Sequence, residues 1–163
     1  METIPVELRL LLLIVVANGT PIVAAALCGQ RGAWPVDGGR VLADGFRLLG
    51  DSKTWRGFVL APLAAGASAV LLGLPVWIGG VVGVAAMLGD LLSSFIKRRL
   101  GMSPSSRASG LDQIPESLFP LLAVADEFAL TGSAILLTLG GFVVLEITLS
   151  PIFYWIGIRN RPY

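Results

Sequence analysis

The sequence predicts an all-α membrane protein, a polytopic bundle of about five transmembrane helices. Of its 163 residues, 55% are apolar and only 14% are charged, whereas soluble domains carry roughly 25% charged residues. Mean hydropathy is +0.80. The apolar residues are also grouped into long runs, and about 20 consecutive apolar residues cross a hydrocarbon core roughly 30 Å thick.

Five apolar runs follow one another along the chain. The predicted spans are about 8–28, 58–74, 77–96, 117–125 and 133–158. The first run is too long for the core of a signal peptide and has no basic leader, so we expect a retained helix. Asn18 and Pro21 interrupt it, and Pro75 marks a tight turn before the third run.

The fourth run is the shortest. It has only nine residues, and a spanning helix needs about 17. Extending it from Pro115 to Leu130 makes it marginal, with Asp126 and Glu127 near the far interface. The alternative is a re-entrant segment, which leaves four true spans.

The placement of basic residues favours five spans. With five, eleven of the twelve Lys and Arg residues lie on one side and only Arg9 on the other. Basic residues in short loops mark the cytoplasmic face, so we expect the N-terminus outside and the C-terminus inside. Four spans would put the basic tail outside. We therefore expect one integral-membrane domain over 1–163 in the cell membrane, with two polar loops, 29–56 and 97–115, in the cytoplasm.

Composition restricts the possible chemistry. The chain has no histidine and a single cysteine, Cys28, which excludes His-based catalysis, Cys zinc sites and an intramolecular disulfide. The net charge of +1 gives no reason to expect a nucleic acid partner. Any catalysis must use carboxylates, cations, hydroxyls and amides, and carboxylate and water ligands suit magnesium, manganese or calcium.

The first polar loop ends in a segment rich in Gly, Ser and Thr, residues 50–57, that carries Lys53 and Arg56. Glycines let the main chain approach a ligand, and Lys and Arg neutralise phosphate oxygens. The segment is not a Walker loop, because Asp51 and Ser52 stand where that motif needs a glycine before Lys-Thr. A solvated basic loop is an equal alternative for Arg31, Arg40 and Arg47, and a weaker one for Lys53 and Arg56.

The third predicted span ends in a polar sequence. On a helix Asp90, Ser94 and Lys97 fall close to one face. An ionisable residue inside a membrane helix usually marks a functional site, and Asp90 lies about two turns before the basic cluster at 97–99, where it could hold a cation. The alternative is an ion pair that serves packing. Arg98 and Arg99 are equally plausible as interfacial anchors and as ligands.

Asp112 supplies a second carboxylate at the same predicted interface. Two carboxylates, several cations and glycine-rich backbone suit magnesium-assisted phosphoryl or nucleotidyl transfer. Asp112 could also cap the next helix, and the two roles are compatible. Asn18 either lines a polar cavity or hydrogen-bonds a neighbouring helix. Glu146 in the last span either binds a cation or makes a structural pair.

These motifs together resemble a known family. The segment from Gly89 to Arg99 with 111–113, the motif Asn18-Gly-Thr-Pro, the motif Pro35-Val-Asp and residues 50–57 are similar, in order, to the CDP-archaeol synthases. That family is related to the phosphatidate cytidylyltransferases, the CDP-diacylglycerol synthases. The resemblance implies five spans, a cytoplasmic active site, magnesium as cofactor, and reaction of CTP with a lipid phosphate to give a CDP-lipid and pyrophosphate.

The resemblance also implies roles at matching positions. Asp90 and Asp112 correspond to the metal-binding carboxylates, and Lys53, Lys97 and Arg98 to phosphate contacts. The positions that correspond to supporting residues around the nucleotide and lipid head are Asn18, Thr54, Arg56 and Ser94. The chain departs from the bacterial-type signature in lacking its Lys-Asp pair and Gly-His-Gly-Gly stretch. Pro115 stands where the related families usually place another Asp, and Glu116 is adjacent to it.

Two other classes of function fit parts of the sequence. A small ion or solute transporter could use Asp90 and Glu146 as ion sites, and it would show flux across liposomes without binding CTP. A non-catalytic membrane subunit could use its basic inner face to bind anionic lipids. The presence of Asp90, Asp112 and the Lys53 segment on one predicted face favours the enzyme over both.

Overall fold

The computed structural model contains five α-helices, as the sequence predicts, and describes residues 4–103, 108 and 110–155, without the side chains of 151–154. The helices are α1 (Val6–Cys28), α2 (Trp55–Leu71), α3 (Val76–Arg99), α4 (Gln113–Ala123) and α5 (Gly132–Trp155). Among the described residues the only β-type pairings are two isolated bridges in the 29–54 loop. The all-α prediction is confirmed.

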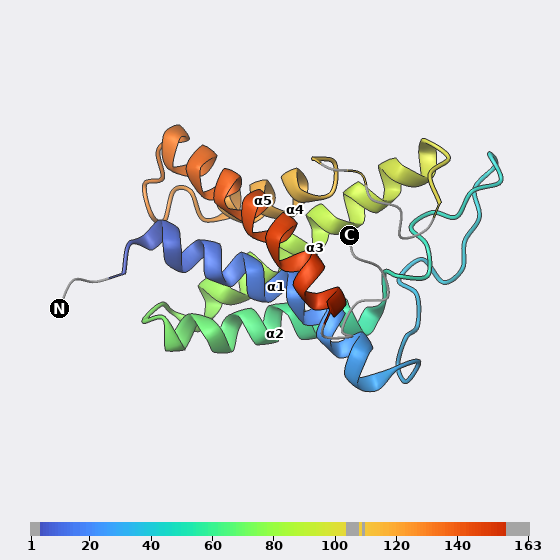
Figure 1. Ribbon diagram of the computed structural model, residues 1–163, viewed down its shortest axis with the longest axis horizontal. Coiled ribbons are helices and arrows are strands. Elements are labelled where there is room, and N and C mark those ends of the chain that lie inside the picture. The colour runs from blue at the N-terminus through green and yellow to red at the C-terminus, as the bar shows by residue number, and fades with distance from the viewer. Residues whose placement is uncertain (1–3, 104–107, 109, 156–163) are drawn as a thin grey trace.

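The helices lie roughly along one long axis, so the connections gather at two ends (Figure 1). The short turn before α3 and the α4–α5 connection lie at the end where α1 begins. The 29–54 loop and the α3–α4 connection lie at the other end, which we call the polar end. Arg107, Arg159 and Arg161, which the sequence assigns to this side, lie outside the described residues.

Helix α3 is the central element. It packs against α1, α2 and α4, and 50% of its most apolar stretch is buried, against 28% for α1 and 11% for α5. Ile78 and Val82 of α3 join Leu13 of α1 and Phe142 of α5 in one core cluster. Residues on α3 are therefore the best placed to be shielded from both water and lipid.

Small residues bring α3 close to its neighbours. A Cβ built on Gly83 would lie 2.5 Å from the Cα of Pro62 in α2, and one built on Gly89 would overlap the carbonyl of Pro115 in α4. Main chains at such distances allow dense packing in a membrane, where helix association relies on close van der Waals contact. The contact at Gly89 puts Asp90 directly beside the first turn of α4.

The helices differ in their reach. α1, α3 and α5 are long and apolar enough to cross a membrane, and α2 is a shorter apolar helix. The 11 residues of α4 rise about 16 Å, roughly half of a hydrocarbon core. The orientation of the bundle, with the N-terminus outside, stays a prediction that rests on the distribution of basic residues.

Candidate active site

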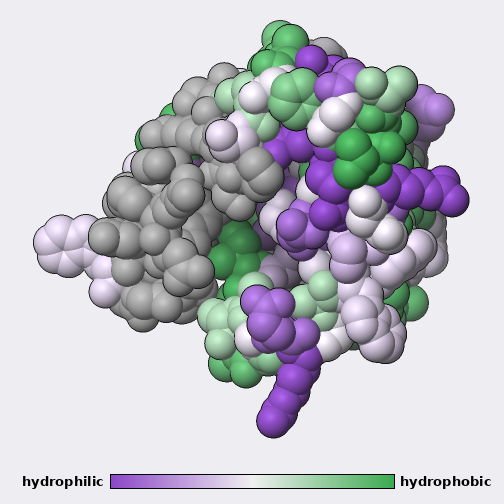
Figure 2. Space-filling model, turned by 90° about the vertical axis from the view of Figure 1, so that its right-hand side faces the viewer, coloured by the Kyte–Doolittle hydropathy of each residue, from purple (hydrophilic) through white to green (hydrophobic). Residues whose placement is uncertain are grey.

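The polar end carries a cluster of charged side chains from three parts of the chain. Lys53 comes from the loop before α2, Asp90 and Lys97 from α3, and Asp112 and Glu116 from the start of α4. Viewed from this end, hydrophilic residues gather over the middle of the coloured surface (Figure 2). We call Lys53, Asp90, Lys97, Asp112 and Glu116 the charged cluster.

Lys53 and Asp90 form the first ion pair of the cluster. The Nζ of Lys53 lies 2.5 Å from Oδ1 and 2.6 Å from Oδ2 of Asp90. About one fifth of each side chain is exposed, 19% and 20% respectively. Burial lowers the pKa of Lys53, but the negative charges of Asp90 and Glu116 and the hydrogen bond to Asp90 raise it more, so the net pKa is above its ordinary value. Lys53 is therefore a firmly charged cation.

Lys97 and Asp112 form the second pair. Their Nζ and Oδ1 atoms are 2.6 Å apart, and both side chains are largely buried. Asp112 stands directly before α4 but does not cap it through its side chain; its second oxygen accepts a hydrogen bond from the backbone N–H of Ala108 at 3.1 Å. The sequence analysis allowed Asp112 to cap α4. In the structure its carboxylate forms an ion pair with Lys97 and makes no capping hydrogen bond.

The two pairs belong to one electrostatic unit. Lys53 interacts with the charges of Asp90, Glu116 and Asp112, and Asp90 interacts with Lys97. Glu116 is buried and hydrogen-bonded to Asp90. Glu146 on α5 lies near enough to repel Glu116. The two aspartates that the sequence predicts to meet are thus at the same end of the bundle and share neighbouring cations.

Arg98 adds a buried cation beside the second pair. Only 4% of the residue is exposed, and its Nη2 donates to the carbonyl of Ser103 at 2.9 Å. Its Nε and Nη1 atoms are buried and make no hydrogen bond to any residue that the structure describes, although Asp112 attracts its charge. Ser94, one turn before Arg98 on α3, is also buried. A guanidinium with spare N–H donors suits a phosphate oxygen.

The other predicted site residues make hydrogen bonds to the main chain. The Nδ2 of Asn18 donates to Ile14 in its own helix at 3.1 Å, and the Oγ1 of Thr54 caps α2 by accepting from Gly57 at 3.3 Å. Arg56 donates to the carbonyls of Gly29 and Arg31, just after α1. These bonds give all three residues a structural role. Contact with a substrate stays a prediction for them.

The chain matches one known family over nearly its whole length. A family model described as CarS-like, CDP-archaeol synthase, matches residues 3–163. The chain belongs to the CDP-archaeol synthase family. The predicted membrane-embedded, CTP-dependent cytidylyltransferase is thereby confirmed at the level of the family.

Individual CDP-archaeol synthases match over most of their length. The protein of Methanosphaerula palustris is 39% identical, over 83% of this chain and 81% of its own. That of Aeropyrum pernix is 35% identical, over 94% and 89%. A solved structure described as an intramembrane enzyme for archaeal membrane lipids biosynthesis superposes with a TM-score of 0.72 at 33% identity, over 87% of this chain and 90% of that one.

Glu116 belongs to the charged cluster, although the sequence motifs of this CDP-archaeol synthase family member gave it no role of its own. It stands next to Pro115, where the related families usually place an aspartate. In the structure its side chain is hydrogen-bonded to Asp90. Its burial is the deciding observation, because an acidic residue is seldom buried unless it is paired. The helical register of α4, which begins at Gln113, could not be read from the sequence around Pro115.

Proposed function

We propose that this protein transfers the CMP group of CTP to the phosphate of an isoprenoid ether lipid, giving a CDP-lipid and pyrophosphate. The charged cluster is the proposed active site. The single observation that carries the proposal is that Lys53–Asp90 and Lys97–Asp112 lie together at one end of an apolar bundle. A soluble nucleotide and a lipid headgroup can meet only at such a boundary between water and bilayer.

The donor set of the cluster fits magnesium. Among the residues that the structure describes, no three His, Cys, Asp or Glu side chains form a complete metal cage. Magnesium does not need one, because it is usually bound by one or two carboxylates together with substrate phosphates. We infer that Asp90 and Asp112 hold the ion, with Glu116 beside Asp90. Bound there, magnesium supplies positive charge to the phosphates of CTP.

The reaction needs little proton transfer. An oxygen of the lipid phosphate, already anionic, attacks the α-phosphorus of CTP and forms a phosphoanhydride bond. The bond from the α-phosphorus to the bridging oxygen of the β-phosphate breaks, and pyrophosphate leaves with that electron pair. Lys53 and Lys97 neutralise charge on the leaving group, and Arg98 binds a phosphate oxygen through its spare N–H donors. Catalysis then consists of positioning and charge stabilisation.

The apolar surface suits a lipid substrate whose tails stay in the bilayer. One face of α3, with Trp77, Val84 and Leu88, is apolar and exposed at the surface of the bundle. Such a surface can contact the hydrocarbon chains of a lipid while a polar headgroup reaches the water boundary at the polar end. The names of the relatives favour an ether-linked isoprenoid lipid phosphate over a diacyl phosphatidate. The distribution of basic residues favours a site that faces the cytoplasm of the cell membrane.

The test is direct. Purified protein is incubated with CTP, magnesium and a panel of ether and ester lipid phosphates, and products are identified by mass spectrometry. We expect a CDP-lipid and pyrophosphate, loss of both with EDTA, and recovery when magnesium is restored. Asp90→Asn and Asp112→Asn should abolish turnover. Asp126→Asn is the matched control, because Asp126 is an exposed carboxylate in the α4–α5 connection, and this connection lies at the opposite end (Figure 1). Turnover retained in either cluster variant would remove the metal assignment.

A further inference from the structure

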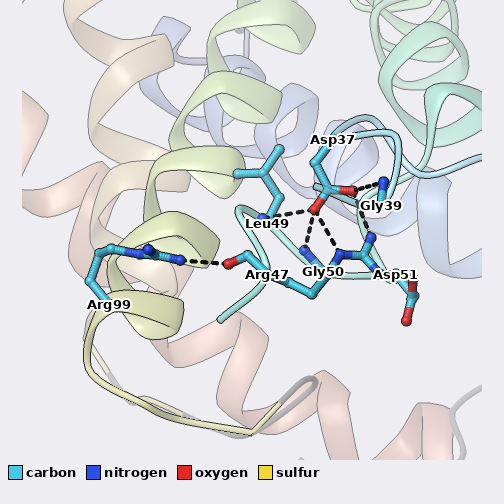
Figure 3. Close-up of polar contacts among 7 residues, drawn as sticks. All are labelled: Asp37, Gly39, Arg47, Leu49, Gly50, Asp51 and Arg99. Atoms are coloured by element: carbon cyan, nitrogen blue, oxygen red, sulfur yellow. Dashed lines mark hydrogen bonds and ion pairs between the residues drawn. The ribbon is translucent and has the colours of Figure 1, made fainter. Parts of the chain in front are cut away.

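Asp37 is a buried carboxylate of the first loop that lies outside the charged cluster. Its side chain is 0% exposed and accepts five hydrogen bonds (Figure 3). Three come from the backbone N–H groups of Gly39, Leu49 and Gly50, at 3.0, 3.0 and 3.1 Å. Two come from the guanidinium of Arg47, at 2.6 and 3.3 Å. These hydrogen bonds hold residues 39 and 47–50 of the loop around one carboxylate.

The charge of Asp37 is fixed. Burial raises its pKa, but the hydrogen bonds from Arg47 and from three backbone N–H groups lower it further, so the net pKa lies well below its ordinary value. The two glycines among these donors, Gly39 and Gly50, have φ values of 84° and 103°, in the left-handed region where other residues are strained. The loop therefore has the backbone geometry needed to aim these N–H groups at one carboxylate.

The main chain of Lys53 is hydrogen-bonded to this loop through both its carbonyl and its N–H group. The N–H of Val36, next to Asp37, donates to the carbonyl of Lys53 at 2.8 Å, and Pro35 forms a bridge with Thr54. On the other side, the N–H of Lys53 donates to the carbonyl of Gly50 at 3.3 Å, and Gly50 is one of the residues that Asp37 binds. Lys53 is thus three residues from a main-chain atom fixed by Asp37.

The same loop is tied to the end of α3. The Nη1 of Arg99 lies 2.6 Å from a carboxylate oxygen of Asp44, and its Nη2 donates to the carbonyl of Arg47 at 2.6 Å. Arg47 is in turn the ion-pair partner of Asp37. A continuous set of contacts therefore joins Asp37 to the last turn of the helix that carries Asp90 (Figure 3).

We propose that Asp37 is a positioning residue, which fixes residues 47–53 against α3 and so sets the ammonium of Lys53 against Asp90. It acts through Lys53 and does not contact substrate. This inference rests on the proposed function only in that Lys53 serves the reaction. Its structural part, the anchoring of the Lys53 segment by one carboxylate, is measurable without turnover.

The first measurement is amide hydrogen exchange with the full-length protein in detergent. In Asp37→Asn an NH2 group replaces one acceptor oxygen, so at least one N–H group faces a donor. We expect exchange over residues 47–54 to accelerate about tenfold or more, with α1 and α3 unchanged. Asp51→Asn is the matched control, because Asp51 also pairs with Arg47 but its side chain is 80% exposed; its exchange should stay at the wild-type rate. Unchanged exchange in Asp37→Asn overturns the proposal.

The second measurement tests whether Asp37 acts through Lys53. CTP affinity is measured by equilibrium dialysis in wild type, Asp37→Asn, Lys53→Gln and the double variant. We expect Asp37→Asn to weaken CTP binding about tenfold in wild type and less than about threefold in the Lys53→Gln background. An equal loss in both backgrounds, or none in wild type, rules out positioning through Lys53. Wild-type protein that forms no CDP-lipid contradicts the proposed function and leaves the exchange result standing.

A charge swap separates the backbone contacts from the ion pair. Asp37→Arg with Arg47→Asp keeps opposite charges but removes the acceptor for Gly39, Leu49 and Gly50. We expect fast exchange over 47–54 to persist in the swap. Arg47→Lys, which keeps Asp37 and a cation, should stay within threefold of wild type in CTP affinity. Restoration of slow exchange by the swap overturns the anchoring role of the carboxylate.

Discussion

Gly89 of α3 lies with its main chain against the carbonyl of Pro115 in α4, and a methyl group at Gly89 would overlap that carbonyl. The contact sits between α3, which carries Asp90, and the first turn of α4, which Asp112 directly precedes. Because it is backbone against backbone, no side-chain rotation can relieve an added atom. The separation of the two aspartates therefore depends on a glycine at this position.

Gly89→Ala should push α3 and α4 apart. We expect a loss of about 1–3 kcal/mol in the free energy of unfolding, the usual cost of overpacking, together with a fall in CDP-lipid formation. Thermal unfolding in detergent and the mass-spectrometric assay measure the two effects. Gly80→Ala is the control, since nothing lies within 4 Å of a Cβ there, and alanine favours a helix. Equal stability of the two variants would contradict the packing argument.

The helices could be predicted because runs of apolar residues are a property of composition and length. The residues at which the helices begin were harder to predict. α2 begins at Trp55, and not near residue 58, because Thr54 caps it. α4 begins at Gln113, and not near 117, because Pro115 fits the first turn of a helix, where its missing N–H leaves no bond unmade. Local polar residues that belong to helix ends look like loop in a hydropathy pattern.

The candidate site was predictable in part for a similar reason. The sequence predicted that Asp90 and Asp112 lie at one end of the bundle, because Asp90 is near the end of one apolar segment and Asp112 stands before the next. It could not assign Lys53 to Asp90, a pairing across 37 positions. That pairing depends on how the 29–54 loop folds, and the fold of this loop depends on Asp37 and its donors, up to 13 residues away. Such contacts have no periodicity to reveal them.

Removing one member of the Lys53–Asp90 pair should cost more than removing both. Lys53→Met leaves the partly buried carboxylate of Asp90 without its nearest cation, a loss of up to about 3 kcal/mol in the free energy of unfolding. We expect the double variant Lys53→Met with Asp90→Asn to regain part of that stability without regaining turnover. Chemical denaturation and the CDP-lipid assay check this. Stability that falls additively in the double variant would show that the two side chains do not depend on each other.

The stability gap between wild type and Lys53→Met should not change between pH 6 and 9. The pKa of Lys53 is raised in the folded protein, so its contribution is fully present below the pKa of an unfolded lysine. It is lost only as pH rises through the higher folded value. Denaturation midpoints of both proteins across this range test the prediction. A gap that closes near neutral pH would mean that the folded pKa of Lys53 is lowered.

Asp37 should show the opposite pH dependence. Its pKa is held below its ordinary value by Arg47 and the backbone N–H groups, so its stabilising effect is present above the pKa of an unfolded aspartate and declines as pH falls toward the folded value. We expect Asp37→Asn to be less stable than wild type at pH 7 by about 1–3 kcal/mol. The difference should be constant down to about pH 5 and shrink below about pH 4. A gap that grows in acid would contradict this.

Arg98 should separate stability from substrate binding. Its buried guanidinium has two nitrogen atoms, Nε and Nη1, without hydrogen bonds to the described part of the chain, and burying such unpaired groups is unfavourable for the folded protein. If those N–H groups serve to bind a phosphate, Arg98→Gln should unfold at a temperature equal to or above that of wild type, while the KM for CTP rises about tenfold or more. Arg40→Gln, at an exposed position in the first loop, should alter neither quantity. A variant at Arg98 that unfolds earlier and binds CTP normally would make this arginine a structural residue, because its charge would then be serving the fold through Asp112 and Ser103.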